Sequence, residues 1–110
     1  MPYNELINHR ILEILSRWQE TFISKKMFGG TCHLLNGNMV CGVYKDFLIL
    51  RLGEENAVSA LREPHTKVFD ITGKPMKGWV MVSEEGIKNE DTLEQWLLKA
   101  KNFAAALPPK

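Results

Sequence analysis

Three short apolar runs joined by two tight turns constrain the fold more than any other feature of this sequence. Asn36-Gly37 separates residues 31–35 from residues 39–44, and Lys45-Asp46 separates the latter from residues 47–52. Asn-Gly is typical of two-residue hairpin loops, because a type I′ turn needs positive φ at both central positions. The pattern therefore predicts three consecutive antiparallel strands.

Two-residue loops also fix which residues face each other. They pair Leu34 with Met39, Cys32 with Cys41, and Val43 with Leu48. Side-chain alternation then predicts an entirely apolar core face made of Cys32, Leu34, Met39, Cys41, Val43, Leu48, Leu50 and Leu52. The opposite face contains a second apolar group, which comprises Leu35, Val40, Tyr44, Phe47 and Ile49.

Segments with helical periodicity lie on both sides of these strands in the sequence. Apolar residues recur every three or four positions over residues 3–22, with Asn4 as the expected N-cap, and again from near Asn89 or Asp91 to residue 107. Residues 53–63 predict a short helix, and residues 67–71 and 78–82 predict two more strands. The order α-β-β-β-α-β-β-α indicates an α+β fold, a two-layer sandwich with a largely antiparallel sheet.

Size and composition restrict the class of protein. The 110 residues, 45% hydrophobic and 25% charged, fit one globular domain over residues 1–110. A net charge of +1 gives no overall field that would attract nucleic acid. The sequence has no signal-peptide pattern and no apolar run near the roughly 20 residues that span a bilayer, so no membrane association is expected. Two cysteines without a signal peptide indicate reduced thiols and a cytoplasmic location.

The segment KKMFGG has two interpretations. Lys25, Lys26, Gly29 and Gly30 could form an anion site, but phosphate loops place their glycines before a helix, and strand signals follow here. We therefore favour a glycine turn that leads into the first hairpin, with Met27 and Phe28 as core or edge packing.

A second basic segment, TGKPMKGWV, contributes Lys74 and Lys77. If it lies next to KKMFGG, four lysines and Trp79 would share a surface able to hold nucleic acid. Lysines that protect exposed strand edges are the commoner explanation.

The cysteine and histidine residues give little support for catalysis. Cys32 and Cys41, as predicted cross-strand neighbours, could form a disulfide, but two small buried residues with unreactive thiols are favoured. His33 points away from them, so a zinc site is not expected. The sequence has no recognised nucleophile motif and no nucleophile–base pair. We expect no enzyme activity, no metal and no cofactor.

The second apolar face is the candidate interface. In a two-layer fold the face with Leu35, Val40, Tyr44, Phe47 and Ile49 has no helix over it, and contiguous exposed apolar area marks interfaces. A homodimer or a protein partner would bury it. A helix or the chain ends could equally cover it within the monomer, and the sequence leaves these alternatives open.

Four segments together resemble a known family. KMFGG, NGNMVCGV, LRLG and TGKPMKGWV are similar to the N-terminal domain of the TfoX (Sxy) competence regulators, and the similarity covers nearly the whole chain. The resemblance implies a secretion-chaperone-like α+β fold and a bacterial, transcription-regulatory setting. Full-length regulators of this kind act with the cyclic-AMP receptor protein and carry a C-terminal domain that resembles helical DNA-binding modules. This sequence ends where that domain would begin, so we expect a stand-alone version. The resemblance supplies no ligand or site residues.

Overall fold

The computed structural model describes residues 3–27, 29–70 and 73–109. Its elements follow the order α-β-β-β-β-α-β-β-η-α, which confirms the α+β class and adds one strand to the expected order. They are α1 (Glu5–Ser16), β1 (Ile23–Met27), β2 (Gly30–Leu35), β3 (Asn38–Tyr44), β4 (Phe47–Arg51), α2 (Glu54–Ala60), β5 (Thr66–Val68), β6 (Trp79–Ser83), the 3₁₀ helix η1 (Glu84–Ile87) and α3 (Glu90–Ala105).

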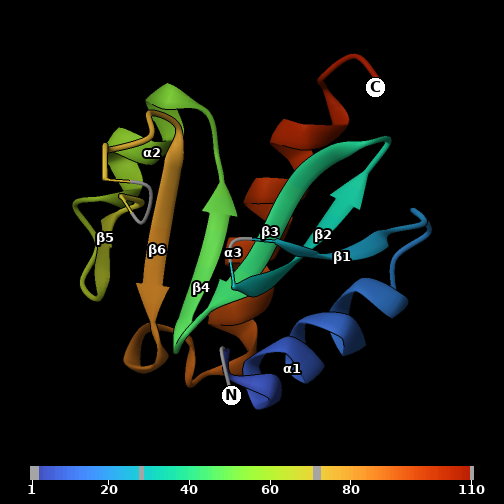
Figure 1. The fold of residues 1–110 in the computed structure, drawn as a ribbon, viewed down its shortest axis with the longest axis horizontal. Helices are drawn as coiled ribbons and strands as arrows, with labels where there is room; N and C mark the ends of the chain where they lie inside the picture. The colour runs from blue at the N-terminus through green and yellow to red at the C-terminus, as the bar shows by residue number, and fades with distance from the viewer. Residues whose placement is uncertain (1–2, 28, 71–72, 110) are drawn as a thin grey trace.

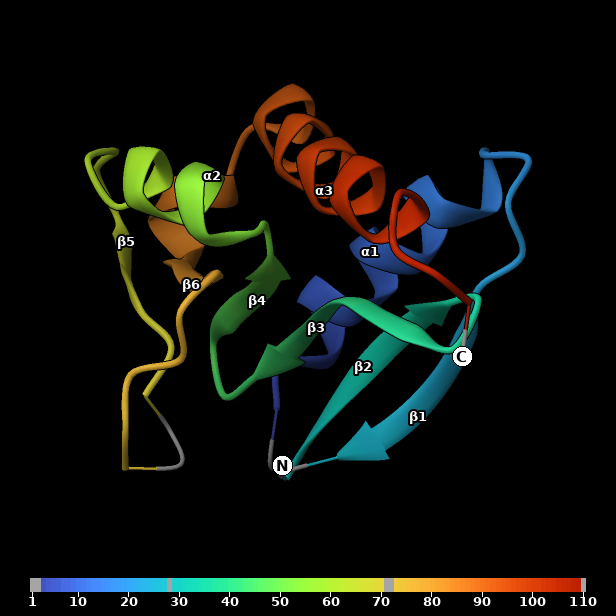
Figure 2. The same cartoon turned by 90° about the horizontal axis from the view of Figure 1, so that it is seen from above.

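The strands form one antiparallel sheet in the order β1-β2-β3-β4-β6-β5 (Figure 1). The three α-helices lie on one side of this sheet, and its other side carries none of them (Figure 2). Asn4 caps α1 as expected, because its side-chain oxygen accepts the N–H groups of Leu6 and Ile7. Asn89 caps α3 in the same way.

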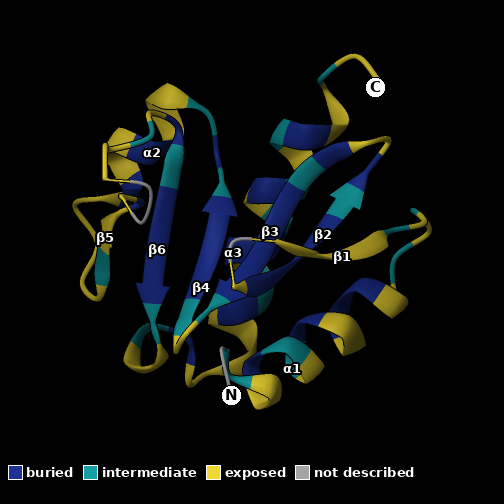
Figure 3. Ribbon diagram, in the orientation of Figure 1, coloured by how far each residue is buried: buried dark blue, intermediate teal, exposed yellow. Residues whose placement is uncertain are grey.

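Strand β1 was not expected from the sequence. Its residues ISKKM are exposed throughout and contain no apolar alternation, so periodicity gives no strand signal (Figure 3). The first helix accordingly ends at Ser16 rather than at residue 22, and Trp18 and Phe22 pack against the core from the segment that follows it. The hairpin connecting β1 to β2 pairs Met27 with Gly30.

The two hairpins predicted from the sequence behave differently. The β3–β4 hairpin has the expected register, with Tyr44 opposite Phe47 and Val43 opposite Leu48. In the β2–β3 hairpin, Asn36 and Gly37 have the positive φ of the expected turn, and Leu34 pairs with Met39. A β-bulge then shifts the register, so that the next pair is His33 with Cys41.

The bulge is the reason that several face assignments were wrong. It leaves Val40 as an extra residue between two paired positions of β3. Val40 therefore packs with the helix-side core, and Met39 packs on the opposite face. Cys32 pairs with Gly42 instead of Cys41.

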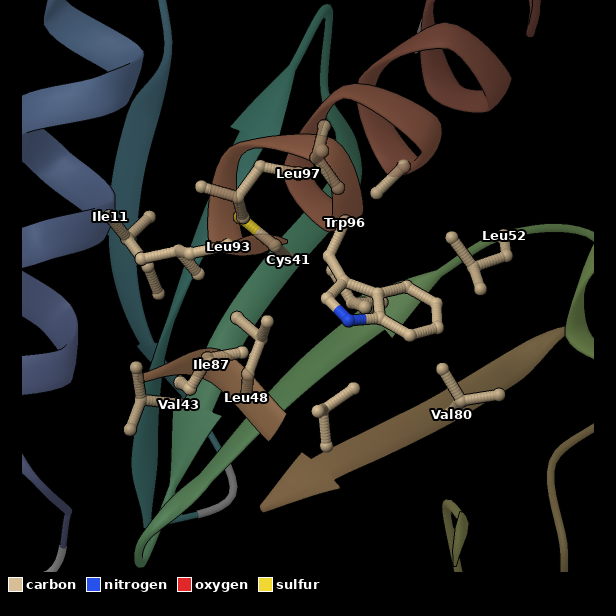
Figure 4. Packing of buried hydrophobic residues seen from close by; sticks show 14 of the residues in the cluster. Ile11, Cys41, Val43, Leu48, Leu52, Val80, Ile87, Leu93, Trp96 and Leu97 are labelled. Carbon is tan, nitrogen blue, oxygen red and sulfur yellow. The ribbon is translucent and has the colours of Figure 1, made fainter. Parts of the chain in front are cut away.

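The main core lies between the helices and the sheet. Side chains from α1, α3, β3, β4 and β6 meet there, with Trp96 of α3 lying over the strands (Figure 4). Ile11, Leu48, Leu50 and Leu97 are completely buried. Segments outside the described residues include the end of the expected strand 67–71 and part of the TGKP turn.

Candidate functional site

The sheet face without α-helices carries a second apolar cluster, which we call the outer-face cluster. Its buried members are Ile49, Phe69 and Met81, and its partly buried members are Met39, Tyr44, Phe47, Met76 and Trp79. Alternation along β4 explains the division between the two faces, because Leu48 and Leu50 point to the helices and their neighbours point away. The second apolar face therefore remains partly exposed.

Three of the five residues expected on this face lie in the outer-face cluster. They are Tyr44, Phe47 and Ile49. The expected positions of Leu35 and Val40 were wrong, because both pack in the helix-side core. The bulge at Val40 explains both outcomes. It places Val40 itself on the helix side, and it reverses the expected face of the β2 residues, which include Leu35.

The chain itself covers part of the outer face. Phe69 follows β5, and its ring stacks on Trp79 of β6 with centroids 5.5 Å apart. The Met76 N–H donates to the Phe69 carbonyl at 3.0 Å, which holds this connection against the sheet. Sequence reasoning placed Phe69 in the expected strand of residues 67–71 and left Met76 in the connection before the next strand. It assigned neither residue to the outer face.

Cations lie over the aromatic rings of this cluster. The Lys45 Nζ is 5.4 Å from the Tyr44 ring centroid, and the Lys67 Nζ is 5.1 Å from the Phe47 centroid. The Arg51 guanidinium is 5.5 Å from the Trp79 centroid. These distances are typical of cation–π contacts. The outer-face cluster therefore combines apolar rings with positive charge.

The four lysines of the alternative nucleic-acid surface occupy two places. Lys25 and Lys26 lie on β1, at one end of the sheet. Lys74 and Lys77 lie in the connection before β6, and strands β2, β3 and β4 separate β6 from β1. The sheet order therefore does not bring the two pairs together on neighbouring strands.

The glycines of KKMFGG have backbone roles. Gly29 has a φ of +77° in the β1–β2 loop, which favours glycine. Gly30 belongs to β2, where a Cβ atom would lie 2.0 Å from the Val43 carbonyl oxygen. This geometry is that of a hairpin turn and lacks the following helix of a phosphate loop. Phe28 lies outside the described residues.

The two cysteines do not form the expected cross-strand pair. Both are free thiols, and Cys41 lies in the helix-side core. Cys32 is on the other face, where its Sγ lies 3.1 Å from the Met27 Sδ. Burial raises the pKa of both thiols, most strongly for Cys41. The prediction that Cys32 and Cys41 face each other was therefore wrong.

A buried polar network was also missed. His33 of β2 is 0% exposed, and its Nδ1 lies 2.7 Å from the hydroxyl of Ser24 on β1. Its Nε2 lies 2.8 Å from the Asn8 side-chain oxygen on α1. Burial lowers the pKa of His33 to about 4. The fold thus brings Ser24 and Asn8 to the two ring nitrogens of His33, an arrangement that the sequence did not predict.

Residues 3–27, 29–70 and 73–109 hold neither a metal-binding cluster nor a membrane-spanning helix. These ranges contain no group of three or more His, Cys, Asp or Glu side chains that could hold a metal ion. No helix in the described part of the chain is long and apolar enough to cross a membrane.

The fold and the outer-face cluster define a small α+β domain with a partly covered apolar sheet face. The family model of the TfoX N-terminal domain matches residues 13–104, and the chain belongs to this family. It is a competence- or transcription-regulator-like domain, of regulatory type and not a known enzyme family. Neither a curated protein nor a solved structure matches this chain.

Proposed function

We propose that this domain acts in a regulatory complex by binding another protein through the outer-face cluster, and that this role requires no catalytic turnover. The observation that best supports this proposal is the half-buried group of Tyr44, Phe47 and Trp79 on a sheet face without α-helices (Figure 2). Aromatic residues and methionine are enriched at the centres of protein interfaces. Family membership supports the regulatory setting.

The charges around the cluster favour a particular kind of partner. Lys45, Arg51 and Lys67 lie over its rings. A partner with an apolar centre and an acidic rim complements that arrangement, whereas a second copy would bring equivalent cations toward one another. We therefore favour a different protein over a homodimer.

The test compares two variants, each of which introduces one carboxylate. Phe47→Glu places a carboxylate in the outer-face cluster, and Leu6→Glu places one on α1, where Leu6 is 68% exposed. We expect Leu6→Glu and the unmodified protein to retain the same partner from an extract of the native cells, and Phe47→Glu to lose it. Circular dichroism should show equal helix content in all three proteins.

Light scattering then separates the two kinds of partner. The isolated protein should be a monomer in low and high salt. If the unmodified protein is a dimer and Phe47→Glu dissociates it, the partner is a second copy of this chain and not a different protein. Equal retention of partners by Phe47→Glu and Leu6→Glu would contradict the use of this face.

A further inference from the structure

The network around His33 connects the β1–β2 hairpin with α1. Ser24 and His33 are paired residues of β1 and β2, and their side chains meet at 2.7 Å. Asn8 contacts the other ring nitrogen from α1 at 2.8 Å. A hydroxyl, an imidazole and an orienting amide in series are the parts of an activated nucleophile.

The hydrogen-bond partners fix the tautomer of the imidazole. The Asn8 side-chain oxygen faces Nε2, and an amide oxygen can only accept a hydrogen bond. Nε2 therefore carries the proton, so Nδ1 presents its lone pair to the Ser24 hydroxyl. Ser24 donates its proton toward the base, which is the arrangement required for nucleophilic attack by its oxygen.

The hydroxyl can be reached from outside, whereas the base cannot. Ser24 is exposed on the edge strand, and His33 on the neighbouring strand is completely buried. Ser24 also lines a groove of about 340 Å³ at the end of α1. The other lining residues are Leu12, Leu15, Ser16, Trp18, Glu20, Thr21 and Phe22.

Strand geometry supplies a further donor next to the hydroxyl. Counted from the hairpin loop after Met27, Ser24 and His33 occupy a non-hydrogen-bonded pair of the antiparallel ladder. The Ser24 N–H therefore points away from β2, toward the open edge of the sheet, because β1 is the terminal strand. A backbone N–H in that position can stabilise negative charge on a reacting carbonyl oxygen.

We propose that Ser24 is a reactive serine that accepts an acyl group from an activated ester, with His33 as general base and Asn8 as a positioning residue. The groove favours a short apolar acyl group, because Leu12, Trp18 and Phe22 line it beside the hydroxyl. This modification site is independent of the outer-face cluster, since Ser24 and His33 do not belong to that cluster.

The proton and the leaving group balance without a co-reactant. The Ser24 Oγ bonds to the ester carbonyl carbon while its proton passes to His33 Nδ1. The carbon–oxygen bond to the leaving group then breaks, and the Nδ1 proton passes to the departing alkoxide. The products are an ester on Ser24 and a free alcohol, and His33 returns to its neutral form.

The experiment uses p-nitrophenyl butyrate with the whole protein. Intact-mass spectrometry should show one butyryl group per chain, and peptide mapping should place it on Ser24. Ser59 of α2 is the control, because it is an exposed serine that lies outside this groove. Ser24→Ala should lower the labelling rate by about 10-fold or more, and Ser59→Ala should leave it unchanged.

A second pair of variants tests the base without removing the imidazole. Asn8→Asp places a carboxylate against Nε2–H, which strengthens the base and should increase the rate of Ser24 labelling. Asn8→Ala removes the orienting group and should decrease it. Equal labelling of the unmodified protein and Ser24→Ala, or rates that do not respond to either Asn8 variant, would overturn the proposal and leave the network a purely structural link between β1 and α1.

Discussion

Both faces of the sheet carry apolar residues, but the two faces differ in what covers them. On β4, Leu48 points to the helices and is completely buried, whereas its neighbour Phe47 points to the outer face and is partly exposed. The helix-side face packs mainly aliphatic residues against α1 and α3, and the outer face carries aromatic and methionine side chains under a short connection. A face closed by helices supplies stability, whereas a face with partial cover leaves apolar side chains partly accessible.

The largest effect should come from the covered face. Leu48→Ala removes a completely buried side chain and leaves a cavity between the sheet and the helices. We expect the free energy of unfolding to fall by about 3 kcal/mol. Urea denaturation followed by circular dichroism measures it, and a loss smaller than that of Phe47→Ala would reverse the comparison between the two faces.

A comparable effect on stability should follow from protonation of His33, which is buried. The pKa of His33 is about 4 in the folded protein and near 6.5 in the unfolded chain, so the unfolded state binds the proton first as the pH falls. The stability that neutral His33 contributes is fully present above pH 6.5 and is lost as the pH falls through about 4. We expect the free energy of unfolding to fall by about 3 kcal/mol through His33 as the pH is lowered over this range.

The matching control for this titration is His33→Gln, which keeps hydrogen-bonding groups but cannot be protonated in this range. Chemical denaturation at several pH values between 7 and 4 should give a shallower slope for the variant than for the unmodified protein. Parallel curves would show that His33 does not titrate differently in the two states.

The smallest effect on stability should come from the outer face. Phe47→Ala removes a ring that is already partly in contact with water, so the free energy of unfolding should fall by about 1.5 kcal/mol. Partner binding should fall more strongly than stability, in contrast to Leu48→Ala. If Phe47→Ala retained full partner binding, the outer face would be a second core and not an interface.

Local sequence signals predicted the α+β class and most of the elements. The Asn36-Gly37 turn and the Lys45-Asp46 loop were assigned correctly, because turn chemistry depends on a few neighbouring residues. Strand β1 was missed because an exposed edge strand needs no apolar alternation. Leu35 and Val40 were assigned to the wrong face because the bulge has no sequence signal of its own.

The sequence by itself determined the helices, the strands β2, β3 and β4, and the apolar character of both sheet faces, since these follow from periodicity and turn residues. Only the tertiary structure decided which residues meet across elements. It separated Cys32 from Cys41, brought Phe69 and Met76 over the outer face, and placed Ser24 and Asn8 on either side of His33. Such contacts depend on register shifts and on long-range packing, which residues close together in sequence do not encode.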